Sequence, residues 1–252
     1  MKRTLALILC ALTLAYIGGT TLTSAENGMK IGKATVRAVH GTVQYTINDG
    51  PPMKVRVNMT LDPGATIITG PESYTDLSVN GISSVVRINA DSKLVLKEMQ
   101  YYGSLFSGDQ QTMIDLKSGE ILGNVKKISA DSRYEINTPH GVAGIRGTDF
   151  QVTIKLAPDG RFLVTFTSVQ GVVIVSALVG ANAAPVVKTL TSGQSWTPGE
   201  GDVVATELVP LRQALRVLTV LAQYVIFTPP PTPGPHNPFG ETGGPAPGES
   251  KQ

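Results

Sequence analysis

The feature that most constrains this fold is an alternation of apolar and polar side chains that recurs between residues 34 and 200. In the stretch FQVTIKL, residues 150–156, every second side chain is apolar, and the turn sequence PDG leads into a second such stretch, RFLVTFTSV. A period of two residues is that of a β-strand with one buried face. These strands predict an all-β fold, either a jelly-roll-like sandwich of two packed sheets or a short β-solenoid.

Dipeptides that end in glycine divide this region into short strands. Asn80-Gly81 is a strong β-hairpin signal, because both of its residues tolerate positive φ. Pro63-Gly64, Ser118-Gly119 and Gln170-Gly171 are further turn signals, and we interpret them as points where short strands end.

The C-terminal part of the chain changes character. Residues 204–227 carry leucines at steps of three and four, which is the period of an amphipathic helix. We expect this single helix to pack its apolar face on the β-domain, with self-association or membrane contact as alternatives. Residues 228–252 are rich in Pro and Gly and predict a disordered tail.

The N-terminus predicts the compartment. Lys2 and Arg3 precede an apolar run over residues 5–17, and small residues follow at 23–25. This pattern is typical of a secretory signal peptide, residues 1–25, and the apolar run is short for a membrane span. We therefore expect an exported protein, periplasmic or extracellular, with no stable membrane span after cleavage.

Composition narrows the function classes. The chain has 21 Lys and Arg against 19 Asp and Glu, and two of its cations lie in the signal peptide. A mature charge near zero argues against a nucleic-acid binder. The single cysteine, Cys10, also lies in the signal peptide, so no disulfide is expected in the mature β-domain, residues 26–203.

The sequence carries no catalytic or metal-binding pattern that we recognise. The three histidines have no metal-ligand spacing, and nucleophile-elbow and phosphate-loop motifs are absent. Two acidic pairs could flank a glycosidic bond, but pairs this ordinary occur in any chain with as many acids. We predict no catalytic residue, no cofactor and no metal. The candidate metal-binding or catalytic residues are His40, His140, His236, Asp131 with Glu135, and Asp109 with Asp115.

One glycine-rich stretch resembles a known family. INTPHGVAGIRGTDFQV, residues 136–152, resembles the hallmark of FecR-type domains: Thr-Pro, small residues, Arg-Gly-Thr, then Phe at the start of a strand. Residues 61–96 and 171–196 resemble other parts of the same domain, so the resemblance covers about residues 36–200. The predicted structural motif consists of Thr138, Pro139, Gly144, Arg146, Gly147, Thr148 and Phe150.

The resemblance implies a non-enzymatic exported module that binds a protein partner or an envelope component in sensing or scaffolding. The best-known FecR-type proteins are membrane regulators that relay a signal from an iron-siderophore receptor to a sigma factor. Only four residues precede the apolar run over residues 5–17, so we expect no sigma-binding domain before it. The alternative is an envelope polysaccharide-binding or processing protein, for which Tyr101, Tyr102 and Phe106 would form a stacking surface.

The role of Arg146 needs its own explanation, because its guanidinium lies among glycines that allow tight turns. A strand rather than a helix follows, which argues against a phosphate-binding loop. A guanidinium offers five donors, so we expect Arg146 to fasten turn carbonyls or a carboxylate, with Asp149 as one candidate. Contact with a ligand or partner and catalysis are the alternatives.

Overall fold

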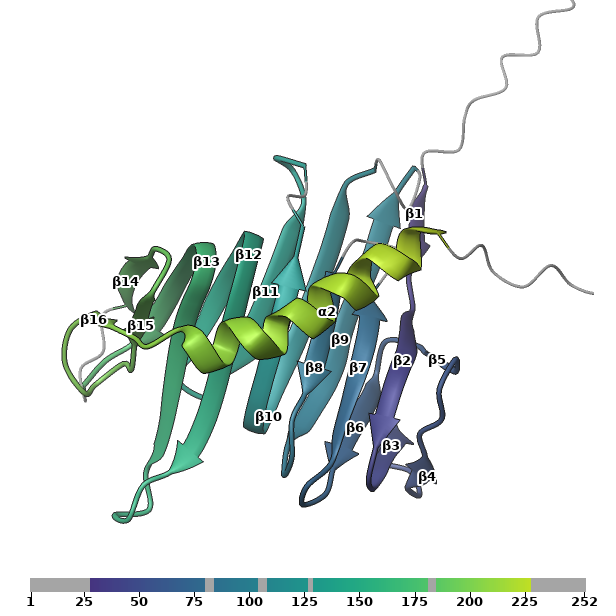
Figure 1. Ribbon diagram of the computed structural model, residues 1–252, viewed down its shortest axis with the longest axis horizontal. Coiled ribbons are helices and arrows are strands. Elements are labelled where there is room, and N and C mark those ends of the chain that lie inside the picture. The colour runs from purple at the N-terminus through teal and green to yellow at the C-terminus, as the bar shows by residue number, and fades with distance from the viewer. Residues whose placement is uncertain (1–27, 80–83, 104–107, 127–128, 181–184, 228–252) are drawn as a thin grey trace, which may run out of the picture.

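The computed structural model describes residues 28–79, 84–103, 108–126, 129–180 and 185–227. The predicted signal peptide, the Pro/Gly-rich tail and Phe106 lie outside these ranges. The described chain forms strands that pair into one continuous sheet and a single helix (Figure 1). The prediction of an all-β fold with one C-terminal helix is confirmed.

The paired strands are arranged in two layers, which we call the helix-side layer and the opposite layer. Six of the described strands belong to the helix-side layer only: β2 (Ala34–His40), β5 (Thr60–Leu61), β7 (Tyr74–Val79), β8 (Ser84–Ile88), β15 (Gln194–Trp196) and β16 (Val204–Ala205). The opposite layer likewise has β1 (Met29–Ile31), β3 (Val43–Ile47), β4 (Met53–Lys54), β6 (Ala65–Thr69), β9 (Lys93–Tyr102), β11 (Arg133–Thr138) and β14 (Pro185–Leu190).

Three long strands belong to both layers: β10 (Gln110–Val125), β12 (Gly141–Leu156) and β13 (Phe162–Leu178). The first half of β10 pairs with β9 and β11, and its second half pairs with β8 and β12. Likewise, one half of β13 pairs with β15 and the other half with β14. The three strands therefore join the two layers into one sheet. Only the β10–β11 pairing is parallel among the described strands.

The two layers enclose one apolar core. A single buried cluster contains Tyr134 and Leu94 from the opposite layer and Trp196 and Leu77 from the helix-side layer. Phe150, on β12, is fully buried in the same cluster. The inward-facing side chains of one layer thus pack against those of the other layer, as the two-residue period requires.

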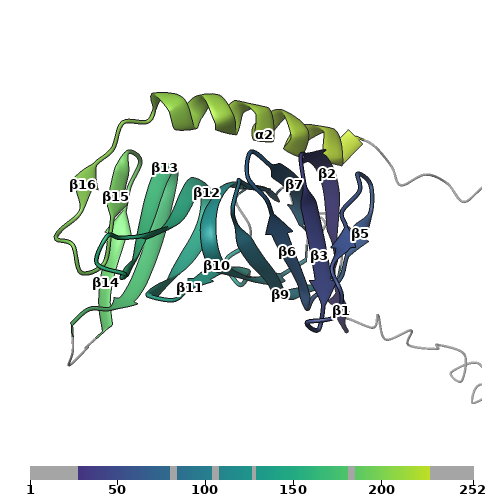
Figure 2. The same cartoon turned by 90° about the horizontal axis from the view of Figure 1, so that it is seen from below.

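The helix, α2 (Val209–Phe227), lies along the outer face of the helix-side layer (Figures 1 and 2). Leu215 and Leu218 are buried against Val85, Leu122 and Val169 of that layer. The predicted apolar face is therefore confirmed. The helix begins later than the predicted residue 204, because residues 204–205 form β16. Within the part of the chain that is described, no helix is long and apolar enough to cross a lipid bilayer.

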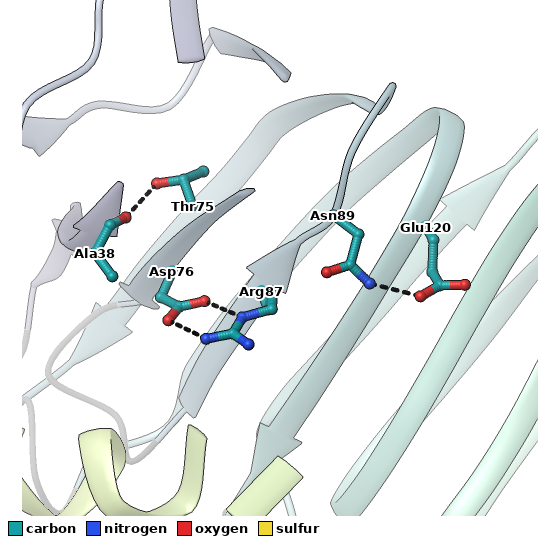
Figure 3. Close-up of polar contacts among 6 residues, drawn as sticks. All are labelled: Ala38, Thr75, Asp76, Arg87, Asn89 and Glu120. Atoms are coloured by element: carbon teal, nitrogen blue, oxygen red, sulfur yellow. Dashed lines mark hydrogen bonds and ion pairs between the residues drawn. The ribbon is translucent and has the colours of Figure 1, made fainter. Parts of the chain in front are cut away.

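Polar side chains on the helix-side layer are paired across strands (Figure 3). Arg87 donates from Nε to Asp76 Oδ1 at 2.7 Å and from Nη2 to Oδ2 at 2.8 Å. Asp76 is fully buried, and the Arg87 guanidinium lies 4.3 Å from the centre of the Tyr74 ring. Such a bidentate pair fixes the register of β7 against β8.

Candidate functional site

The glycine-rich stretch forms a corner at which the chain passes between the two layers. Strand β12 bends at Gly147 and strand β13 bends beside it at Gly171, with φ angles of 63° and 96°. The β12–β13 register shifts between Arg146 and Asp149, so a β-bulge lies at the bend. A Cβ atom at Gly171 would lie 2.6 Å from the Gly147 carbonyl oxygen, so the two strands approach too closely there for a side chain.

The turn signals at Ser118-Gly119 and Gln170-Gly171 were interpreted wrongly as strand ends. β10 runs through Gly119, which has a φ of 85°, and β13 runs through Gly171. A glycine at positive φ bends a long strand without ending its hydrogen-bonded ladder.

Thr148 fastens the corner. Its side chain is buried, and its Oγ1 lies 2.8 Å from the carbonyl oxygen of Val172 and 3.0 Å from that of Arg146. The hydroxyl hydrogen can therefore be donated to the nearer carbonyl, that of Val172, or shared between the two strands at the bend, where the register shifts.

The other motif residues have related roles. Thr138 Oγ1 donates to the carbonyl oxygen of Gly141 at 2.7 Å and accepts from its backbone N–H at 3.1 Å. These bonds close the β11–β12 hairpin turn that contains Pro139. Phe150, the first inward side chain after the bulge, occupies the space left by Gly123 on β10.

Arg146 does not have the predicted role. Its side chain is exposed, and its guanidinium has no hydrogen bond or ion pair with any described residue. Asp149, the proposed partner, instead accepts a hydrogen bond from the Asn124 side-chain amide. The prediction that Arg146 fastens the fold is wrong, because its neighbour Ile145 faces the core and Arg146 therefore faces outward.

A groove of about 470 Å³ lies beside Arg146 on the outer face of the opposite layer. Arg133 and Glu135 of β11 line one side, and Val172 and Ile174 of β13 line the other. The two apolar side chains are 42% and 51% exposed. Arg133 donates to Glu135, and this hydrogen bond raises the pKa of Arg133.

Gly144 forms the floor of this groove. A Cβ atom there would meet only the Ile174 carbonyl oxygen, at 3.8 Å, and the backbone of Gly144 does not have the left-handed conformation. The fold therefore does not require glycine at this position, which distinguishes Gly144 from Gly147 and Gly171. Its missing side chain keeps the groove open.

Two further hollows adjoin the corner. One, of about 320 Å³, is lined by Asn124, Lys126, Gly147, Asp149 and Gln170, among others. The next, of about 630 Å³, shares Asp149 and Gln170 with it and reaches Arg212 and Arg216 on α2. Burial raises the pKa of Asp149, and the hydrogen bond from Asn124 opposes this shift.

The catalytic alternatives gain no support from the described residues. Asp115 accepts from Asn137 and pairs with Lys117, whereas Asp109 accepts from Ser129. His40 stacks on Tyr74 with ring centres 5.2 Å apart. No group of three or more potential metal ligands occurs in the described ranges. His140 lies exposed in the β11–β12 turn and lines a separate hollow of about 490 Å³.

The proposed aromatic stacking surface is partly taken up by contacts within the protein. Tyr101 and Tyr102 pair with β1 at the edge of the opposite layer, and the Lys30 ammonium lies 5.9 Å from the centre of the Tyr101 ring. Val172 and Ile174 were not among the residues predicted from the sequence to form a site. Their signal is the run GVVIV, residues 171–175, which is apolar at successive positions although only one face of that strand is inward.

Residues 65–169 match the family model described as FecR protein. Among solved structures, two crystal structures of a candidate anti-sigma factor from Parabacteroides distasonis ATCC 8503 are similar. One is 16% identical with a TM-score of 0.42 and covers 60% of this chain and 63% of its own. The other is 14% identical with a TM-score of 0.43 and covers 64% and 74%. The chain thus spans less than two thirds of the first structure. No curated protein matches the sequence significantly.

Proposed function

Because residues 65–169 form a FecR domain, we propose that this protein is an exported, non-enzymatic module that binds a protein partner in sensing or signal transduction. A FecR domain supports a regulatory role of this kind. Export is supported by the secretory pattern of residues 1–25.

The groove at Gly144 and Arg146 carries the proposal. It combines exposed aliphatic side chains with a guanidinium that pairs with none of the described residues, on strands held in place by the Thr148 corner. Arginine and apolar side chains are typical components of the energetically important part of an interface. An exposed arginine without a partner among the described residues is available to a binding protein.

Photo-crosslinking in the cells that produce the protein tests this proposal. A photoreactive amino acid is placed at Val172, in the groove, or at Val57, which is 51% exposed and is not a groove residue. We expect a discrete protein adduct from position 172 and none from position 57. Adducts that are equal at both positions, or no adduct at 172, would contradict the proposal.

A further inference from the structure

The three hollows at the corner share lining residues, and we refer to them together as the band. The groove at Gly144 shares Gly147 with the second hollow, which shares Asp149 and Gln170 with the third. Five cationic residues line the band, against two acidic ones. The cationic residues are Lys126, Arg133, Arg146, Arg212 and Arg216.

Most of these cationic side chains form no ion pair within the described part of the chain. Arg133 is paired with Glu135, whereas none of the other four cations forms an ion pair with a described residue. Asp149, the second acid, is held by Asn124, and burial raises its pKa and so disfavours its charged form. The corner is therefore locally basic in a chain whose formal net charge is only +2.

The apolar part of the band is aliphatic. Val172 and Ile174 line the groove beside Arg146, and no aromatic ring other than that of the buried Tyr134 is among the groove residues. Sugar rings are usually held by exposed aromatic faces, and membrane-binding side chains protrude rather than line a hollow. Aliphatic walls beside a guanidinium suit a polypeptide that carries both carboxylates and aliphatic side chains.

We propose that this basic corner binds an acidic, extended segment of a protein partner, with its carboxylates on Arg146, Lys126, Arg212 and Arg216 and its aliphatic side chains against Val172 and Ile174. This inference rests on the proposed function and adds the chemistry of the partner. Charge complementarity of this kind determines partner choice and association rate.

Fluorescence anisotropy with labelled peptides tests the chemistry on the secreted full chain. The probes are the octapeptides (Glu-Val)4, (Glu-Ser)4 and (Lys-Val)4. We expect (Glu-Val)4 to bind most tightly, (Glu-Ser)4 more weakly and (Lys-Val)4 not at all, with affinity falling as salt is added. Arg146→Glu should weaken (Glu-Val)4 binding by about tenfold or more, since it places like charges together. Lys97→Glu, at an exposed lysine outside the band, is the matched control and should change little.

Equal binding of (Lys-Val)4, alginate or anionic phosphatidylglycerol vesicles would overturn the inference, as would an unchanged affinity of the Arg146→Glu variant. Failure of the peptides with a retained Val172 crosslink would reject the acidic chemistry alone. Loss of both would reject the proposed function as well.

Discussion

The hydroxyl of Thr148 lies 2.8 Å from the carbonyl oxygen of Val172, at the point where β12 and β13 both bend from one layer to the other. This contact shows how the corner is held although the neighbouring Arg146 side chain bonds to none of the described residues. A buried hydroxyl, rather than the guanidinium, lies within hydrogen-bond distance of a backbone carbonyl oxygen on each strand at the bulge.

Thr148→Val should destabilise the fold, because valine fills the same space but leaves the Val172 carbonyl without its donor. Losing one such hydrogen bond costs about 0.5–1.5 kcal/mol. Chemical denaturation measures the free energy of unfolding. Thr189→Val, at an exposed position on β14, is the control and should change stability by less than about 0.5 kcal/mol. Equal stability of both variants would show that the hydroxyl does not hold the corner.

Two glycines of the same region should respond in opposite ways to valine. Gly171→Val requires a β-branched residue at a φ of 96° and a close contact with Gly147, so we expect a loss of about 1–3 kcal/mol or more. Gly144→Val meets no close atom and suits a strand, so its stability should equal or exceed that of the wild type. Thermal unfolding compares them, and similar losses in both variants would mean that Gly144 also serves the fold.

Asp149 should make stability depend on pH. Burial raises its pKa in the folded protein, so the folded state holds this proton more tightly than the unfolded chain. Wild-type stability should therefore fall, relative to the Asp149→Asn variant, as the pH rises from about 3 to about 7. The measurement is the difference in free energy of unfolding between the two proteins at each pH. A difference that stays constant over this range would contradict the burial of this carboxyl.

The alternation of side chains was sufficient to predict the strands around PDG and the strands on either side of Asn80-Gly81. The antiparallel pairing of β12 with β13 confirms the hairpin around PDG. Strands β7 and β8 also pair antiparallel, whereas Asn80 and Gly81 lie outside the described residues, so a turn at this pair stays a prediction. Here a local period and a local turn determine the structure. The leucine spacing likewise predicted the buried face of α2, because one apolar stripe determines which side of a helix packs.

The course of the long strands could not be predicted in the same way. Gly119 and Gly171 are typical turn residues, but a glycine at positive φ serves a bend as well as a turn, and only strand pairing distinguishes the two. The environment of Arg146 depends on whether the inward position falls on Ile145 or on Arg146 itself. The bulge that determines this is set by contacts with β13, which is distant in the sequence.

The most direct test of the central claim combines stability and partner contact in Arg146→Glu. This claim is that the corner keeps Arg146 free of the fold for a partner. We expect the melting temperature of Arg146→Glu to equal that of the wild type, because the exposed side chain contributes nothing to the described contacts. The crosslink from position 172 should be lost in the same variant. A lowered melting temperature, or a crosslink that persists unchanged, would contradict the account.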